Sequence, residues 1–297
     1  MNIEKMKYFI DLVECRNFTE TAKKNFVSQT TISQQIASLE KEFDMHLIDR
    51  KQIPIEPTQA GWFLYAEALV LWKQYNHIKA KMENYKQHHT QTLTIQYAGM
   101  TDLQILLRFT PDFKENYPNI QLELNRVLLK DISNFLQKGL YDIAVTFDSA
   151  FKGNDDIQTY PLYKGQYCAV IGHQHPLFSH QSISKDELYE YPLIMLNPTA
   201  IGDSYYMMIQ HALEDGYQPN IVRTVDDVET EIFHIITENL IGFFPDNHQL
   251  SYPEDKIRLI PLEDSHHTFR IEIGYLKGNT NPVLQTFLKY IQNSISK

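Results

Sequence analysis

The sequence is poor in cysteine and contains no long apolar run. Only Cys15 and Cys168 occur among its 297 residues. Two distant cysteines cannot staple a small secreted fold, and such sparse use is typical of proteins in a reducing compartment. No stretch reaches the roughly 18 apolar residues of a membrane span, and the N-terminus lacks the segments of an export signal. We therefore expect a cytoplasmic protein with no membrane partner.

The eleven glycines are dispersed, and several catalytic motifs are missing. No G-x-G, G-x-S-x-G, H-E-x-x-H or C-x-x-C pattern occurs. This excludes the usual nucleotide-binding loops, the hydrolase nucleophile turn and the common zinc motifs. His173 and His175 could share one strand face and bind a metal, but they lack a nearby carboxylate or thiol, and a turn is the simpler interpretation. We expect no cofactor and no catalytic residue.

Acidic residues are abundant, but they are unevenly distributed. The net charge is −10, whereas residues 1–90 hold 12 Lys and Arg against 11 Asp and Glu. Residues 91–297 hold the other 15 basic and 26 acidic residues. A near-neutral domain can bind nucleic acid if its charges segregate by face, whereas a strongly acidic one is poorly suited to it. The length fits about two domains, and the charge indicates that they have different tasks.

The segment NFVSQTTISQQIASLEKEF, residues 25–43, has the features of a recognition helix. Its apolar residues recur at the spacing of one helix face: Ile32, Ile36, Leu39 and Phe43. Ser28 is a suitable N-cap, and Val27 can pack on Ile32 as a hydrophobic staple. Helices are expected before it over residues 5–15 and from a Thr19 cap to about Phe26. The turn at Val27-Ser28 then predicts a helix-turn-helix.

The opposite face of this helix carries uncharged polar residues where a surface helix usually has Lys and Glu. They are Gln29, Thr30, Ser33 and Gln34, with Ser28 and Thr31 in the same turn. Gln can pair bidentately with adenine, and Ser and Thr can bond several base edges. This face predicts contact with double-stranded DNA. A solvated helix in a small bundle is the alternative.

Basic residues flank the predicted recognition helix. The segment MHLIDRKQIPIEPT contains two prolines, which a helix interior does not tolerate, and it predicts a short hairpin or wing. Arg50 and Lys51 lie on this wing, and Lys23 and Lys24 lie on the preceding helix. Such residues neutralise phosphates and position a protein on the duplex.

A long helical segment is expected from Thr58 to about Gln87. Apolar residues recur along it at alternating steps of four and three: Leu64, Ala68, Leu71, Tyr75, Ile78 and Met82. This heptad pattern is typical of paired helices, and a helix about 45 Å long would overhang a small N-terminal domain. We predict that residues 59–90 form a linker helix through which two chains dimerise. Packing on its own domain is the alternative.

The remaining residues alternate β-rich and helical segments, which predicts an α/β fold. The β-rich runs are TLTIQYAG, IQLELNRVL, YDIAVTF, YCAVIG, YPLIML, NIVRTV, IGFFP, IRLIPL and FRIEIGYL. The helical stretches include LQILLRFTPDFKENY, DISNFLQKG and YYMMIQHALEDG.

Together these segments resemble the LysR-type transcriptional regulators. The match is carried by residues 9–43 together with LIDR and PTQAG, at Phe9, Phe18, Ala22, Val27, Ser28, Gln29, Ser33, Ile36, Leu39, Glu40, Leu47, Arg50, Thr58 and Gly61. HPL at His175 to Leu177 and IGFFP at 241–245 are similar to landmarks of the family's C-terminal domain. The family usually has proline at Thr30, arginine at Gln34 and glycine at Asp44, so the base preference at Gln34 stays open.

The resemblance implies three parts: a winged helix-turn-helix DNA-binding domain at 1–58, a linker helix at 59–90, and an effector-binding domain at 91–297. The last would have the two-subdomain α/β fold of periplasmic binding proteins. Subdomain I would comprise about 92–162 and 268–297, and subdomain II about 165–263. The crossings would lie near Leu162 to Gly165 and near Asp264 to Thr268, and a small effector would bind between the subdomains.

The resemblance also implies an effector contact at Thr101. Family members often use a Ser or Thr at the start of the helix that follows the first strand, and Thr101 holds that place. A helix N-terminus attracts an anion, so an anionic effector would suit it, although Thr101 could also be a plain N-cap. The other expected lining residues are Thr146, Phe147, Pro198, Thr199, Ala200 and Phe244.

The expected function is that of a ligand-responsive, sequence-specific DNA-binding regulator, acting as a homodimer or homotetramer. Effector binding would favour one closure of the cleft and thereby change how the DNA is bent. A solute-binding protein without catalytic activity is the alternative. An enzyme is a third hypothesis, but Asp226, Asp227 and Glu229 adjoin no nucleophile, and a solvated helix face explains such a charge run.

Overall fold

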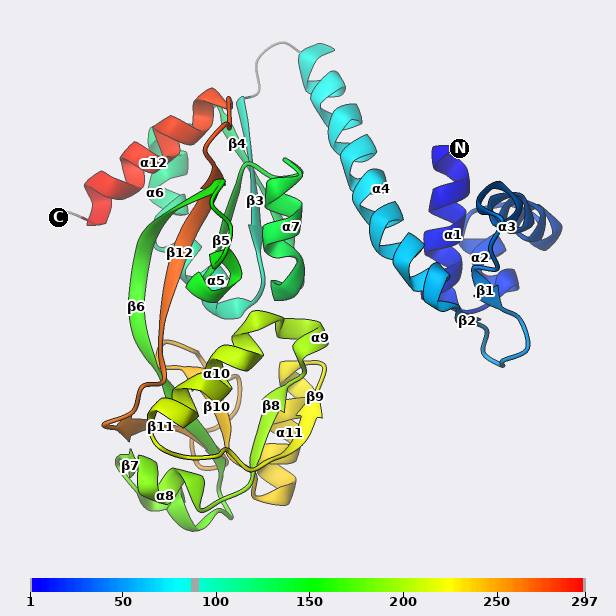
Figure 1. The fold of residues 1–297 in the computed structure, drawn as a ribbon. Coiled ribbons are helices and arrows are strands. Elements are labelled where there is room, and N and C mark those ends of the chain that lie inside the picture. Colours follow the sequence, from blue (N-terminus) through cyan, green and yellow to red (C-terminus); the bar gives the residue numbers. More distant parts are fainter. Residues whose placement is uncertain (1, 87–90, 296–297) are drawn as a thin grey trace. The chain divides into compact units, whose positions relative to one another are not determined.

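The structure, a computed structural model, describes residues 2–86 and 91–295. The chain divides into two compact units, 1–89 and 90–297 (Figure 1). Within the described residues no helix has both the length and the apolar character needed to cross a membrane. The two cysteines are free thiols, Cys15 half-buried and Cys168 buried.

The first unit is a winged helix-turn-helix followed by a long helix. Its elements are α1 (Ile3–Cys15), α2 (Phe18–Lys24), α3 (Gln29–Phe43), β1 (Ile48–Asp49), β2 (Glu56–Pro57) and α4 (Gln59–Lys86). β1 pairs with β2 in antiparallel orientation, which confirms the predicted wing. The core lies where α1 and α3 meet, and Phe9, Ile32 and Ile36 have no exposed surface there.

The helix starts of this unit are set by short polar caps, one of which differs from the prediction. Ser28 caps α3 as expected, because its Oγ accepts from the N–H of Thr31 at 3.0 Å. Asn17, instead of Thr19, caps α2, because its side-chain oxygen accepts from the N–H groups of Thr19 and Glu20. The helix therefore begins earlier than predicted and ends at Lys24.

The first turns of α4 pack on their own unit. Ala68 is fully buried in a cluster with Met6 and Ile10 of α1. A methyl group added at Gly61 would lie 2.0 Å from the carbonyl oxygen of Leu47, so the helix can start this close to the wing only with glycine there. The predicted linker residues 87–90 lie outside the described residues.

The second unit consists of two subdomains, each built around β-strands. The strands are β3 (Gln91–Tyr97), β4 (Ile120–Arg126), β5 (Ile143–Phe147), β6 (Ile157–Gly172), β7 (Ile183–Ser184), β8 (Leu193–Leu196), β9 (Ile221–Val225), β10 (Gly242–Pro245), β11 (Ile257–Glu263) and β12 (Thr268–Leu276). The main path is β4-β3-β5-β12-β6-β11-β7, with β10 also paired to β6. β8 pairs with β9 in parallel.

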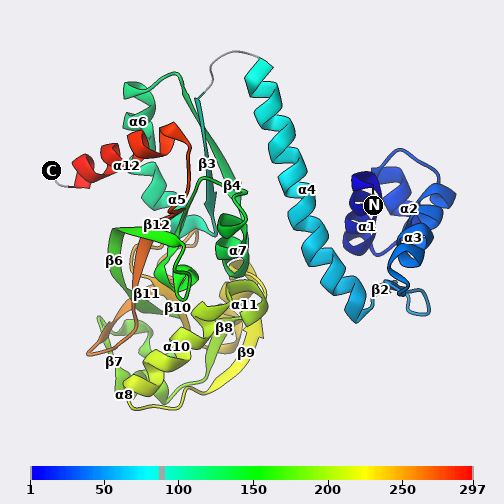
Figure 2. The same cartoon turned by 45° about the horizontal axis from the view of Figure 1, so that its top comes forward.

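Helices accompany both subdomains (Figure 2). They are α5 (Met100–Leu107), α6 (Thr110–Asn116), α7 (Ile132–Gln137), α8 (Lys185–Tyr189), α9 (Pro198–Ile201), α10 (Asp203–Glu214), α11 (Val228–Glu238) and α12 (Pro282–Ile295). The single helical stretch expected over 103–117 is two helices. Pro111 explains the break, because proline fits the first turn of α6 but would clash inside a continuous helix.

β6 is one strand of 16 residues that runs through both subdomains (Figure 1). Its residues from Ile157 to Gln166 pair with β12, and from Tyr167 onward it pairs with β10 and β11. The change of partner falls just after the predicted crossing at Leu162 to Gly165. A methyl group at Gly165 would approach a side-chain oxygen of Asp246 to 2.6 Å, so a larger residue there would displace the Asp246 side chain.

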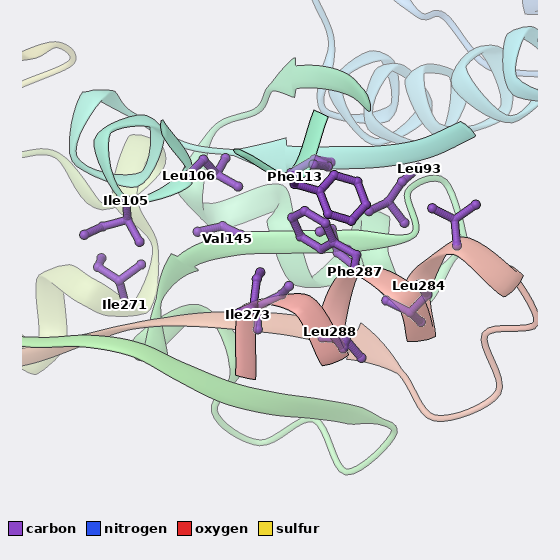
Figure 3. Close-up of a cluster of buried hydrophobic side chains, with 14 of the residues drawn as sticks. Leu93, Ile105, Leu106, Phe113, Val145, Ile271, Ile273, Leu284, Phe287 and Leu288 are labelled. Atoms are coloured by element: carbon purple, nitrogen blue, oxygen red, sulfur yellow. The ribbon is translucent and has the colours of Figure 1, made fainter. Parts of the chain in front are cut away.

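The core of the first subdomain joins its strands to α5, α6 and α12 (Figure 3). Phe113 of α6 and Phe287 of α12 are fully buried, and their rings meet edge to face with centroids 4.9 Å apart. Leu93 and Val145 contribute from the strands. Burying one such side chain stabilises a fold by about 1.5–3 kcal/mol, so this cluster is a main source of the subdomain's stability.

Candidate nucleic-acid interface and ligand cavity

The start of α3 presents an open polar face. Gln29, Thr30 and Gln34 are exposed and Ser33 is half-buried. No side chain of these four makes a hydrogen bond to another residue that the structure describes. On the opposite face, Ile32, Ile36 and Leu39 are fully buried in the core of the unit, whereas Phe43 at the end of the helix is exposed. The helix therefore offers unbonded donors and acceptors to an external partner while its apolar face holds it in place.

Two other residues predicted at this interface take part in the cap of α3. The Oγ of Ser28 accepts from the N–H of Thr31. A second hydrogen bond, of 2.8 Å, joins the hydroxyls of Ser28 and Thr31. Ser28 is exposed and Thr31 is half-buried. Their hydroxyls order the first turn, and each keeps capacity for one further bond.

The basic residues on α2 are paired with acidic neighbours. Lys23 lies 2.8 Å from Glu20. Lys24 contacts Asp11 at 2.7 Å and Glu14 at 2.8 Å, and these bonds raise the pKa of its ammonium group. The positive charge expected for phosphate contacts is thus partly balanced within the unit.

On the wing, the side chain of Arg50 is bonded to its own unit, whereas the side chain of Lys51 bonds to no described residue. Arg50 contacts the Oε2 of Glu40 at 2.9 Å, and the Oε1 of the same carboxylate accepts from the N–H of Leu47 at 2.9 Å. Glu40, on α3, therefore links this helix to the wing through Leu47 and Arg50. Lys51 is exposed, and its ammonium has no acidic partner within 2–86 and 91–295. Arg50 would have to share its guanidinium with Glu40 in order to contact a phosphate.

The predicted dimerisation residues of α4 fall into two groups. Leu64 and Ala68 belong to the core of the unit, and Ala68 has no exposed surface with which to contact a second chain. The other four are exposed by 38–59%: Leu71, Tyr75, Ile78 and Met82. Packing of α4 on its own domain thus accounts for the first part of the pattern. The second part leaves an apolar stripe on the surface, as expected of an interface.

A cavity of about 450 Å³ lies between the two subdomains of the second unit. From the first subdomain it is lined by residues 98–102, at the start of α5, and by Phe147 at the end of β5. From the second it is lined by apolar residues that include Met195, Met208 and Phe244. Its size and apolar lining are typical of small-molecule sites.

Of the predicted effector residues, Thr101, Phe147, Ala200 and Phe244 line this cavity, whereas Thr146, Pro198 and Thr199 do not. Thr146 lies behind the wall, fully buried. Thr199 is exposed, and its N–H and hydroxyl both donate to the side-chain oxygen of Asn197, the N-cap of α9. These bonds hold Thr199 in the first turn of a four-residue helix, away from the cavity.

Thr101 is the second residue of α5, and Gly99 holds the N-cap position. Its side chain is buried, and its Oγ1 lies 3.4 Å from the Nδ1 of His248, which also lines the cavity. Burial lowers the pKa of His248, so the imidazole is neutral at pH 7. Because Gly99 holds the N-cap position, the interpretation of Thr101 as a plain N-cap is wrong.

Asp102, which the sequence did not single out, closes the N-terminus of α5. Its Oδ2 accepts from the N–H groups of Ala98 and Gly99, at 2.7 and 3.1 Å, and from the hydroxyl of Thr146 at 3.2 Å. Its Oδ1 is buried and has no partner within the described chain. Burial raises the pKa of this carboxyl to about 7.

Glu231 of α11 is a second buried carboxyl that lines the cavity. It is 3% exposed and makes no side-chain hydrogen bond or ion pair with any residue in 2–86 or 91–295. Burial raises the pKa of the group well above its usual value. A signal was present in the sequence, since Glu231 lies on the stripe of Val228, Ile232 and Ile235, where an acidic residue is out of place.

His173 and His175 belong to no group of three or more candidate metal ligands among the described residues. His175 is buried, its Nδ1 accepts from the N–H of Leu177 at 3.2 Å, and its ring lies against Tyr191. No group of three or more candidate ligand side chains occurs among the described residues. The pair follows β6 as a turn.

Two family models match the chain. The helix-turn-helix model of bacterial regulatory proteins of the lysR family matches residues 3–62, and the LysR substrate binding domain matches residues 86–296.

Relatives of the chain are similar over their full length. The Hca operon transcriptional activator HcaR of Escherichia coli K12 is 21% identical, with 100% of this chain and 99% of that protein covered. The regulator AlsR of Bacillus subtilis 168 is 23% identical, with 97% and 94% covered. The crystal structure of CbnR, a LysR family transcriptional regulator, has a TM-score of 0.72 at 17% identity, covering 99% of both chains. The structural likeness shows a common fold.

Proposed function

The chain belongs to the LysR family of bacterial transcriptional regulators, and from this premise we propose how its residues bind DNA and respond to a ligand. It is a DNA-binding regulator with a C-terminal domain that takes a small molecule. We divide it into residues 1–58 for DNA binding, 59–90 as linker helix and 91–297 for the ligand. The protein acts by binding, without catalysis, in the cytoplasm where the DNA lies.

In this proposal, α3 lies in the major groove and contacts base edges through Gln29, Thr30, Ser33 and Gln34. The observation that carries it is the polar face of α3, whose side chains bond to no other described residue, opposite the buried Ile32, Ile36 and Leu39. N-terminal residues of a recognition helix reach deepest into the groove. Lys51 on the wing contacts a phosphate. A structure of CbnR in complex with its target DNA has a TM-score of 0.70 to this chain, so the fold is compatible with such a complex.

Two chains pair through the exposed stripe of α4, formed by Leu71, Tyr75, Ile78 and Met82. A dimer places two recognition helices on one palindromic site, and two dimers give a tetramer. The ligand binds in the cavity of the second unit and favours one closure of its two subdomains, which β6 and the segment 264–267 connect. A ligand can shift this equilibrium only by the difference in its affinity for the two closures.

A DNA-binding assay tests the proposed function. The full-length protein is titrated onto fluorescently labelled DNA from upstream of its own gene and onto a shuffled duplex of the same composition, at 150 mM salt. We expect the upstream DNA to bind at least about 10³-fold more tightly, as is typical of specific sites. Equal affinity for the two duplexes would refute the regulator mechanism on α3.

A further inference from the structure

The charges around the cavity are mainly negative. Four carboxyl groups line it, from Asp102, Asp226, Asp227 and Glu231, against the one guanidinium of Arg126. Arg126 is exposed, and its Nε donates to the carbonyl of Ala98 at 3.3 Å. The remaining walls are mostly apolar.

The place that would suit an anion is already occupied. Asp102 accepts the N–H groups of Ala98 and Gly99 at the start of α5, so its own carboxyl sits at the positive end of the helix. A ligand carboxylate there would compete with the Asp102 carboxyl for the same N–H groups. The expectation of an anionic effector, made from Thr101 alone, did not take this neighbour into account.

Glu231 provides the complementary observation. Its side chain is buried at the cavity wall, packed near Gly242, where an added methyl group would lie 3.2 Å from its Oε1. No described residue donates to it. A buried polar group without a partner destabilises a fold, whereas a donor supplied by a ligand removes that cost and adds a charge-assisted bond.

We propose that the cavity takes a small amine, whose ammonium group pairs with the Glu231 carboxylate while an apolar body contacts Phe147, Met195 and Phe244. This assignment rests on the proposed function, since it names the class of ligand for the same cavity. An ammonium has three donors and no acceptor, which matches a site whose free side-chain groups are mainly acceptors. Asp102 also lines the cavity, and its Oδ1 is buried with no partner among the described residues.

Binding would release a proton. Because burial raises the pKa of Glu231 well above its usual value, the empty cavity favours the protonated carboxyl, and an arriving ammonium ion forms the ion pair as that carboxyl gives its proton to solvent. The products are one ammonium–carboxylate pair and one free proton. Affinity for an amine should therefore increase with pH until the amine loses its own proton.

Three probes of similar shape and different charge test the inference on the full-length protein: phenethylamine, 2-phenylethanol and phenylacetate. Affinities are measured by isothermal titration calorimetry at pH 7.5 in two buffers of different ionisation enthalpy, which also counts the protons released. We expect phenethylamine to bind roughly tenfold or more tightly than the alcohol, with proton release, and phenylacetate to bind most weakly.

The variant Glu231→Gln should lower phenethylamine affinity by about the same tenfold factor and leave 2-phenylethanol affinity unchanged. Glu229→Gln is the matched control, because Glu229 is exposed on the same helix and the substitution also removes one negative charge. Its phenethylamine affinity should equal that of the parent protein.

Three results would overturn the inference: tighter binding of phenylacetate, equal binding of amine and alcohol, or an equal loss in the two variants. None of them affects the proposed function if the same protein preparation still prefers its upstream DNA. A preparation without that preference would instead remove the proposed function, whatever the probes do.

Discussion

The α3 face and the cavity place polar groups in opposite settings. On α3, Gln29 and Gln34 are exposed, and they stay solvated until a partner arrives. At the cavity, the Glu231 side chain and the Oδ1 of Asp102 are buried, and neither bonds to another residue that the structure describes. The first arrangement has little effect on stability and leaves specificity to the partner. The second lowers the stability of the empty protein, and a ligand that donates to these groups would restore it.

A core substitution should have the largest effect and tests whether the two sites stand on independent units. Phe287→Ala removes a fully buried ring from the second unit and should lower its stability by about 3–5 kcal/mol. Thermal unfolding of the full chain should then show one transition shifted and the other, from the first unit, unchanged. Phe233→Ala, at a 60% exposed position, is the control and should shift neither. A common shift of both transitions would show that the units are coupled.

A charge on the exposed stripe of α4 should separate the chains. Ile78 is 59% exposed in the single chain, and Ile78→Asp would bury a carboxylate at the proposed interface, with a cost of at least about 1–3 kcal/mol. Sedimentation velocity should show a shift toward monomer. Asn76→Asp introduces the same charge at another exposed position of α4 and should leave the dimer intact. An unchanged association state of the Ile78 variant would place the interface elsewhere.

Removing one side chain from the α3 face should weaken DNA binding without loss of stability. Gln29→Ala should reduce affinity for the upstream DNA by about 1–3 kcal/mol, the worth of a bidentate base contact. The midpoint of thermal unfolding should not change, because the side chain makes no bond within the described chain. Ser38→Ala, at an exposed position nearer the other end of α3, is the control. Equal affinities of the two variants for the upstream DNA would contradict base contacts by Gln29.

The smallest effect is expected for Glu231→Gln on stability without ligand, and it depends on pH. The pKa of Glu231 is raised in the folded state above its usual 4.5, so the parent protein loses stability relative to the variant as pH rises past about 4.5. Urea unfolding at pH 4.5 and pH 8 should show a gap that appears only at the higher pH. Glu229→Gln should show no such gap, and a gap of equal size there would remove Glu231 as its cause.

The sequence predicted the first unit better than the second because its signals are local. The period of Ile32, Ile36 and Leu39 and the cap at Ser28 lie within one segment and are confirmed. The caps of α2 and the pairing of Arg50 with Glu40 were missed, since Asn17 and Glu40 compete with equally plausible neighbours.

In the second unit, the first half of β6 was missed. Pro161 and Gly165 interrupt its strand pattern, because both residues are unfavourable inside strands. Its partner β12 lies about a hundred residues away along the chain. The cavity was equally hard to derive, because it combines the start of α5 with Glu231 on α11, and only folding brings them together. The family resemblance suggested Thr199, but its hydrogen bonds to Asn197 hold it outside the cavity lining.

The most direct test of the α3 assignment is a double-mutant cycle between the protein and the bases. Each adenine of the upstream site is replaced in turn by 7-deazaadenine, which lacks the N7 acceptor that a glutamine amide contacts in the major groove. At one adenine of each half-site, the replacement should weaken binding of the parent protein and leave Gln29→Ala unaffected. Equal losses for both proteins at every adenine would show that Gln29 of α3 does not read the bases.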